Sequence, residues 1–150
     1  GRLDRRQFSW QGKALNVLLD VGHNPHAAEY LVQRLRQRPV SGKRLAVFGL
    51  LADKDLEGVV SALDGYIEHW AVAPLNTART RPASQLQATL EQHGASVSVY
   101  DSIAAALQAQ SGQAVSGDEI VLFGSFYCVA EALDWLERHV TQEAENGFAG

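Results

Sequence analysis

The chain has 150 residues, a formal net charge of −4 at neutral pH and 46% hydrophobic residues. This length and hydrophobic content fit one globular domain with a sizeable core, and they exclude a chain that is disordered throughout. The mild and mixed charge gives no reason to expect nucleic acid or an anionic membrane as a partner. No apolar run approaches the roughly 18 residues that a membrane span needs, and we therefore expect a cytoplasmic protein.

The beginning of the chain predicts an antiparallel pair of strands. Residues 5–15 form an edge strand that turns back at Gln11, Gly12 and Lys13 into an apolar strand at 16–21. Turn-forming residues between two strand-like runs are typical of a hairpin.

Four further apolar runs predict buried strands, and each of the five apolar strands, beginning with the one at 16–21, is followed by a segment of helical period. In the first such segment, Ala28, Leu31, Val32 and Leu35 recur at the spacing of one helix face. Polar stretches at 76–84 and 110–118 predict loops, and the tail after residue 140 loses its period and should fray. The four buried strands are expected at 44–50, 69–74, 96–100 and 119–125.

Strict alternation of strands and helices predicts the fold class. Each crossover between parallel strands covers one face of the sheet, so helices are expected on both faces. We therefore predict an α/β fold with a Rossmann-like, mostly parallel sheet of about six strands, of which the first is antiparallel. No internal repeat or linker divides residues 1–150.

Polar residues that follow the strands should gather at one edge of this sheet. Open parallel sheets bind ligands at the carboxyl ends of their strands, where loops enter helix N-termini. Asp20, His23 and Asn24 follow the first parallel strand, and Ser125 follows the last. The other members of this set are Gly49, Lys54, Arg79, Arg81 and Tyr127.

The sequence His23-Asn24-Pro25 predicts a helix start. Asparagine is a favoured N-cap, and proline suits the first helical position, where an N–H would have no partner. Free amides there could receive an anion beside Asp20 and His23. Taken alone, a plain helix start is the simpler interpretation. A metal site of Asp20, His23 and His26 is a poorer one, because the three side chains need not converge.

The sequence Gly124-Ser125 opens the last helical segment. Glycine permits a tight turn, and the serine hydroxyl can cap the helix or meet a ligand carboxylate beside free amides. These two roles are about equally favoured. A nucleophile elbow is excluded because the G-x-S-x-G pattern is absent. Cys128, the single cysteine, is most simply a small core residue, and it fits a reducing compartment.

Two nucleotide-binding signatures are missing from the chain. It has neither the G-x-x-x-x-G-K-[ST] phosphate loop nor the G-x-G-x-x-G fingerprint. We therefore expect it to supply one half of a composite site rather than to cradle a nucleotide alone. The lack of any methionine, including an initiator, also hints that the chain is part of a longer one.

Four segments together carry a resemblance to a known family: LDVGHNPHAAEYL, VFGLLADKD, WAVAPL and VLFGSFYCVAEAL, in this order. Over nearly its whole length the chain resembles the C-terminal domain of the bacterial bifunctional dihydrofolate synthase/folylpolyglutamate synthases, in the Mur ligase superfamily. It departs at Gly22, where the family usually has alanine and glycine should loosen the turn. It also departs in loop 76–84, which leaves the roles of Arg79 and Arg81 open.

The resemblance implies an ATP-dependent ligase that activates a pterin or folate carboxylate as an acyl phosphate, which the amine of L-glutamate attacks. It implies a phosphate loop, Mg²⁺ ligands and a folate pocket in an N-terminal domain that this chain lacks, so the chain alone is expected to be inactive. Arg2 and Asp20 would contact ATP. His23, Asn24 and Ser125 would bind or orient glutamate, with His23 and Ser125 as the catalytic residues. The expected ligands are ATP, Mg²⁺, L-glutamate and dihydropteroate or folate, and the expected state is a monomer.

Two other functions stay open at this point. One is the same domain of a Mur ligase that acts on a cell-wall precursor, although residues 23–28 and 124–131 favour the folate branch. The other is a non-catalytic α/β binding module in which both motifs are only helix starts. Placement of Asp20, His23 and Ser125 on different faces would favour the binding module.

Overall fold

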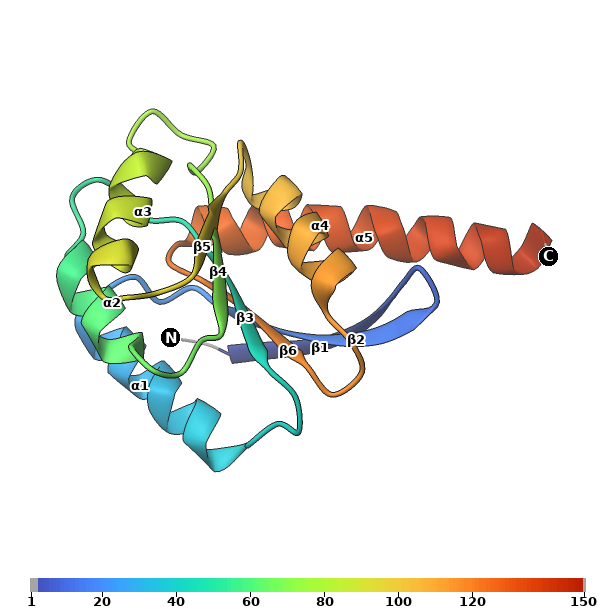
Figure 1. The fold of residues 1–150 in the computed structure, drawn as a ribbon. Helices are drawn as coiled ribbons and strands as arrows, with labels where there is room; N and C mark the ends of the chain where they lie inside the picture. The colour runs from blue at the N-terminus through green and yellow to red at the C-terminus, as the bar shows by residue number, and fades with distance from the viewer. Residues whose placement is uncertain (1–2, 150) are drawn as a thin grey trace.

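The computed structural model describes residues 3–149, which form one sheet between two layers of helices (Figure 1). The strands are β1 (Leu3–Trp10), β2 (Lys13–Asp20), β3 (Arg44–Phe48), β4 (His69–Val72), β5 (Val97–Val99) and β6 (Glu119–Phe123). The helices are α1 (Pro25–Gln37), α2 (Leu56–Leu63), α3 (Ala83–Gln92), α4 (Ile103–Gln113) and α5 (Phe126–Ala149).

The strand order is β1-β2-β6-β3-β4-β5, and every neighbouring pair is parallel except β1 with β2. This confirms the predicted Rossmann-like sheet with an antiparallel first strand. The hairpin turns at Gln11 and Gly12, whose φ values of 51° and 80° are those of a type I′ turn. The turn is one residue shorter than predicted, because Lys13 already pairs with Trp10.

Helices cover both faces of the sheet, as predicted. On one face, α1, α2 and α3 bury an apolar cluster that includes Leu31, Val59 and Leu86. On the other face, α4 and α5 pack over a second cluster (Figure 1). Leu18 and Leu19 are neighbours in β2 and are both buried, one in each cluster. A strand that is buried on both faces is apolar at successive positions, which explains the continuous apolar runs of the sequence.

Helix α4 contains residues that the polar pattern assigned to a loop. Gln110 and Ser111 are buried inside this helix, so the predicted start of the loop at residue 110 is wrong. The Gln110 Nε2 group donates to the carbonyls of Ala46 and His69 at 2.8 and 3.1 Å. The Ser111 hydroxyl donates to the carbonyl of Leu107 at 2.8 Å. Both polar side chains are satisfied, so their burial does not oppose folding.

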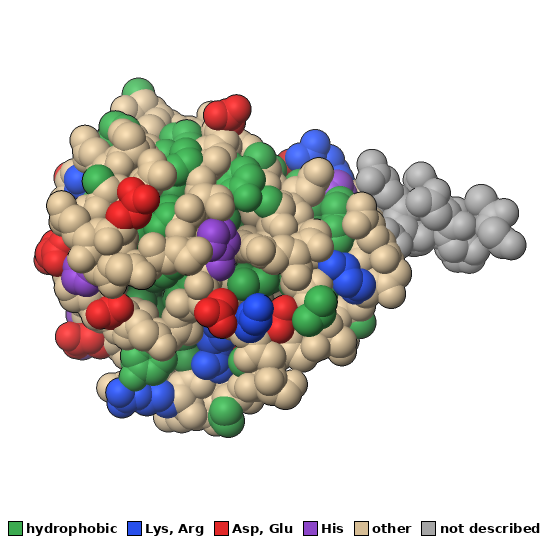
Figure 2. Space-filling view, in the orientation of Figure 1, with side chains coloured by type: hydrophobic (Ala, Val, Ile, Leu, Met, Phe, Trp, Pro, Cys, Tyr) green, Lys and Arg blue, Asp and Glu red, His purple; other side chains and the backbone are tan. Residues whose placement is uncertain are grey.

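The tail after residue 140 continues α5 through Ala149. Residues 141–146 contain glutamine, alanine and glutamate, which favour helices, and neither glycine nor proline. Loss of apolar period therefore did not end the helix. None of the helices within 3–149 has the length and apolarity that a bilayer crossing demands. On the face shown in Figure 2, acidic and basic side chains are interspersed.

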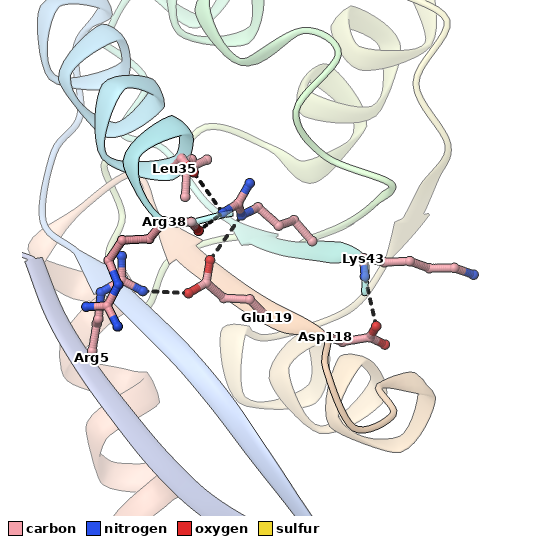
Figure 3. Close-up of polar contacts among 7 residues, drawn as sticks. Arg5, Leu35, Arg38, Lys43, Asp118 and Glu119 are labelled. Atoms are coloured by element: carbon pink, nitrogen blue, oxygen red, sulfur yellow. Dashed lines mark hydrogen bonds and ion pairs between the residues drawn. The ribbon is translucent and has the colours of Figure 1, made fainter. Parts of the chain in front are cut away.

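A buried ion-pair network joins three strands and one helix at the amino ends of β3 and β6 (Figure 3). The Glu119 side chain is only 5% exposed, and it accepts from Arg5 Nη1 at 2.7 Å and from Arg44 Nε at 3.1 Å. Arg44 Nη2 also donates to the carbonyls of Leu35 and Arg38 at the end of α1. One carboxylate thus connects β1, β6 and β3 to α1.

Candidate functional site

The loops that leave β2 and β6 lie side by side at the carboxyl edge of the sheet, which we call the rim. Asp20 and Phe123 are partners in the parallel ladder. Directly beyond them, the Gly124 N–H donates to the Gly22 carbonyl at 3.0 Å. Gly124 has φ 119°, and a Cβ there would collide with the Gly49 carbonyl oxygen. The two motifs therefore meet at one edge and not on different faces.

The β2 loop leads into α1 through the predicted cap. Asn24 has extended backbone angles, its Oδ1 accepts from the Ala27 N–H at 2.8 Å, and Pro25 is the first helical residue. Gly22 permits a close packing contact, because a Cβ at this position would lie 2.8 Å from the Cβ of Ala27. The structure thus gives Gly22 a packing role, and a looser turn at this position stays a prediction.

His23 projects from this loop and is exposed. Its Nδ1 lies 3.3 Å from the Val21 carbonyl oxygen. A carbonyl oxygen only accepts hydrogen bonds, so Nδ1 is the nitrogen that carries the proton in this contact. In the neutral ring Nε2 then keeps its lone pair, and this nitrogen can accept a proton from a ligand.

Asp20 lies beneath the same loop and is only 3% exposed. Its Oδ1 accepts from the Gly22 N–H at 2.9 Å. Burial raises the pKa of this carboxyl because desolvation disfavours the charged form, and the bond from Gly22 opposes part of that rise. Asp20 and His23 also line a small crevice, too narrow to admit a water molecule. The structure thus shows Asp20 supporting the turn, and its contact with ATP stays a prediction.

Ser125 caps α5 at the end of the β6 loop. The residue is only 3% exposed, and its hydroxyl accepts from the Tyr127 N–H at 3.0 Å. This confirms the predicted capping role. A hydroxyl that accepts one bond still has its own proton to donate, so the cap leaves Ser125 able to bind a carboxylate oxygen.

Arg79 reaches the start of α5 from the loop between β4 and α3. Its Nη2 donates to the Tyr127 hydroxyl at 3.1 Å. This bond lowers the pKa of Tyr127, and a hydrogen bond with Thr77 acts in the same direction. The sequence placed Arg79 and Tyr127 at the rim, but it left the role of Arg79 open because the reach of a long side chain cannot be read from strand order.

Arg81, two residues later, has a structural role. Its Nη2 donates to the carbonyls of Ala52 and Lys54 at 2.8 and 2.6 Å, and its Nη1 donates to Gln85. It thereby joins the loop after β3 to the loop after β4. The loop after β3 opens α2, where Asp55 caps the helix by accepting from the Gly58 N–H at 3.0 Å.

Other predicted features lie elsewhere. Arg2 falls outside the residues that the structure describes. Within the part of the chain that is described, no group of three or more His, Cys, Asp or Glu side chains could hold a metal ion. Cys128 is fully buried in the apolar core, and this burial strongly raises the pKa of its thiol.

A larger hollow of about 400 Å³ lies at the opposite edge, lined by residues that include Arg5, Asn16 and Arg38. The size of this hollow does not by itself make it a binding site. The free amides and positive ends of α1 and α5 point to the rim, and an open rim is expected when a site is completed by a second lobe.

The fold and the rim define a Rossmann-like domain in which two capped helix starts, those of α1 and α5, face the same edge of the sheet. Residues 1–126 match the family described as "Mur ligase, glutamate ligase domain", and the chain belongs to this family. A similar protein is the dihydrofolate synthase/folylpolyglutamate synthase of Escherichia coli, 38% identical over 131 residues. That match covers 87% of this chain and 30% of the relative. The protein of the same name from Haemophilus influenzae is 38% identical, over 77% of this chain and 27% of its own length.

Solved structures that are similar to this chain belong to proteins of the same kind. The Escherichia coli protein in complex with ADP is 37% identical with a TM-score of 0.76, over 88% of this chain and 31% of its own. A bifunctional folylpolyglutamate synthase/dihydrofolate synthase with Mn, AMPPNP and L-glutamate bound is 36% identical with a TM-score of 0.75, over 88% of this chain and 30% of its own. The chain therefore spans about 30% of the length of these proteins.

Proposed function

We propose that this chain is the C-terminal, glutamate-binding domain of an ATP-dependent ligase that joins L-glutamate to dihydropteroate and to folates. The observation that carries this proposal is the bond between the β2 and β6 loops, which brings His23 and Ser125 to one rim. The names of the similar proteins support the folate branch over a cell-wall substrate. The solved relative with AMPPNP and L-glutamate supports these two ligands.

The residue types at the rim suit the expected reaction. ATP converts the folate carboxylate to an acyl phosphate, the glutamate nitrogen forms the new C–N bond, and phosphate leaves with the electrons of the broken C–O bond. The glutamate ammonium must lose a proton before it attacks, and His23 Nε2 is free to accept it. Ser125 and Asn24 keep donors for the glutamate carboxylates.

The proposal assigns the remaining parts of the reaction mainly to a second lobe. ATP and Mg²⁺ would be bound chiefly by an N-terminal domain of the full-length protein, since this chain has no phosphate-loop signature. From this side, Arg2 and Asp20 would contact ATP, and bound Mg²⁺ would neutralise phosphate charge during transfer. A cytoplasmic monomer completes the proposal, and the lone buried cysteine is compatible with a reducing compartment.

The test uses the full-length protein that contains this domain, with ADP release measured for dihydropteroate plus L-glutamate and for a UDP-muramoyl precursor. We expect turnover with the folate substrate, and about 100-fold or greater losses in His23→Ala and Ser125→Ala, the scale of a lost acid-base or charge-binding group. Turnover with the muramoyl substrate instead, or wild-type kinetics in both variants, would contradict the proposal. So would ligation by the isolated 150-residue chain.

Two control variants match these substitutions. Ser102 also caps a helix through its hydroxyl, accepting from the Ala105 N–H at 3.0 Å at the start of α4, but it follows the edge strand β5. Ser102→Ala should therefore lose a cap and keep activity. His26 is an exposed histidine in the first turn of α1. His26→Ala should keep activity, whereas a metal site shared with His23 would require a loss.

A further inference from the structure

We propose that Arg79 binds a carboxylate of the incoming L-glutamate and that Tyr127 positions its guanidinium. This proposal rests on the proposed function, because it names a further residue of the same glutamate site. Arg79 belongs to neither of the two sequence motifs of the rim, and the sequence alone left its role open. Three independent observations support it: the anchoring of its loop, the direction of its side chain and the charge balance of the rim.

The loop that carries Arg79 is anchored through its backbone. The Ala52 N–H donates to the Arg79 carbonyl and the Arg81 N–H donates to the Leu50 carbonyl, both at 2.9 Å. Leu51 and Thr80 form a bridge between the same two segments. The side chain of Arg79 is exposed, but its attachment point is therefore fixed relative to β3.

The Arg79 side chain extends to the helix start that holds Ser125. Its Nη2 donates to the Tyr127 hydroxyl, and the Tyr127 N–H donates to the Ser125 hydroxyl. Tyr127 therefore contacts both residues: its hydroxyl binds the Arg79 guanidinium, and its backbone N–H binds Ser125, which is proposed to bind glutamate. A guanidinium has five N–H donors, and the contact with Tyr127 occupies one of them. The planar group keeps paired donors for a carboxylate, which arginine binds in a bidentate manner.

The charges of the rim leave a role for this arginine. L-Glutamate carries two carboxylates, whereas Ser125 and Asn24, the groups proposed to donate to them, are neutral. Arg81 is committed to two carbonyls and to Gln85, so it is not available for a ligand. Arg79 lies beside the positive end of α5, and the two positive potentials add. The hydrogen bond from Arg79, together with the charge of its guanidinium, lowers the pKa of Tyr127.

A structural role for the same contact would be to hold the loop against α5, and kinetics separate the two roles. The experiment compares Arg79→Gln, Arg79→Lys and Tyr127→Phe in the full-length protein. KM for L-glutamate, KM for ATP, kcat and Tm are measured for each. Arg34→Gln serves as the control, since Arg34 is an exposed arginine of α1 whose contact is with Tyr30.

We expect Arg79→Gln to raise KM for L-glutamate about tenfold or more, as for the loss of a hydrogen bond between charged groups. KM for ATP and Tm should stay near wild type. Arg79→Lys should recover part of the loss because it restores the charge without the fork. Tyr127→Phe should raise the same KM by a few fold, since it leaves the arginine present but unpositioned.

Three results would overturn the proposal. One is an unchanged KM for L-glutamate in Arg79→Gln. A second is an increase confined to KM for ATP, which would place Arg79 on the nucleotide. A third is a drop in Tm with no selective change in KM, which would mean a structural contact. If the wild-type full-length protein ligates no glutamate at all, the proposed function itself fails, and this outcome is recognised before any variant is compared.

Discussion

The two edges of the sheet hold their polar side chains in opposite ways. At the amino edge, both carboxylate oxygens of Glu119 are bound by arginines and almost fully removed from solvent. At the rim, His23 and Ser125 each make one contact within the protein and keep further hydrogen-bonding capacity. Polar groups whose hydrogen-bonding capacity is fully used within the protein fix a structure, whereas groups with unused capacity are able to bind a ligand. The first edge should therefore determine stability and the second should determine activity.

The largest effect on stability is expected at Glu119. Glu119→Ala leaves Arg5 and Arg44 without their shared carboxylate in a partly buried setting. The free energy of unfolding should fall by about 3 kcal/mol, the lower end of the range for a broken buried pair, because Arg5 keeps 30% of its exposure and can rehydrate. Urea unfolding of the chain measures this loss.

Asp4→Ala is the control for that experiment. The pair of Asp4 with Arg6 is about half exposed at both ends, so its loss should cost less than about 1 kcal/mol. Similar losses in Asp4→Ala and Glu119→Ala would remove the distinction between a buried network and a surface pair. A folded Glu119→Ala variant of the full-length protein should still ligate glutamate.

A smaller effect is expected at the first helix start. Asn24→Ala removes the side-chain bond to the Ala27 N–H, and the loss should be about 1 kcal/mol in unfolding free energy. Asn24→Ser, which can accept the same bond, should recover most of it. If Asn24→Ala and Asn24→Ser unfold alike, the cap contributes nothing measurable to α1.

The pH dependence of stability should report on Asp20. Its pKa in the folded protein is raised, so its favourable contribution is complete below the pKa of the unfolded chain and is lost as pH rises through the folded pKa. Asp20→Asn keeps an acceptor for the Gly22 N–H and has no charge to bury. The stability of this variant relative to wild type should therefore rise from acid toward neutral pH. A constant difference in unfolding free energy across that range would show that Asp20 does not titrate abnormally.

The smallest effect on stability is expected at His23. Its side chain is exposed and makes one contact at 3.3 Å, so His23→Ala should change the unfolding free energy by no more than about 0.5 kcal/mol. Thermal unfolding beside wild type measures this difference. A loss of several kcal/mol would mean that the imidazole supports the loop rather than a ligand.

Local patterns predicted the rim well because the carboxyl edge follows from strand alternation alone. Asn24 and Ser125 were placed correctly since a helix start has a short and specific signature. Gln110 and Ser111 were wrongly assigned to a loop because hydrogen-bond partners decide whether a polar side chain can be buried. The partners of Gln110 lie on β3 and β4, far from it in sequence.

Contacts between residues that are distant in sequence could not be predicted from local patterns. Arg5 and Glu119 are 114 residues apart, and no local pattern connects an edge strand to the strand that lies beyond its neighbour. Arg79 and Arg81 have the same residue type and nearly the same position, yet one makes a single side-chain contact with Tyr127 and the other binds two carbonyls. Only the path of the folded loop separates them.

The close approach of Gly124 to the ends of β2 and β3 has a consequence for motion. Its N–H is bonded to Gly22, and its Cα leaves no space for a side chain beside the Gly49 carbonyl. The carboxyl ends of the neighbouring strands β2, β6 and β3 are thereby held close together. If this domain rotates to meet another lobe, the two loops move together, so the backbone positions of His23 and Ser125 are set relative to each other before any ligand arrives.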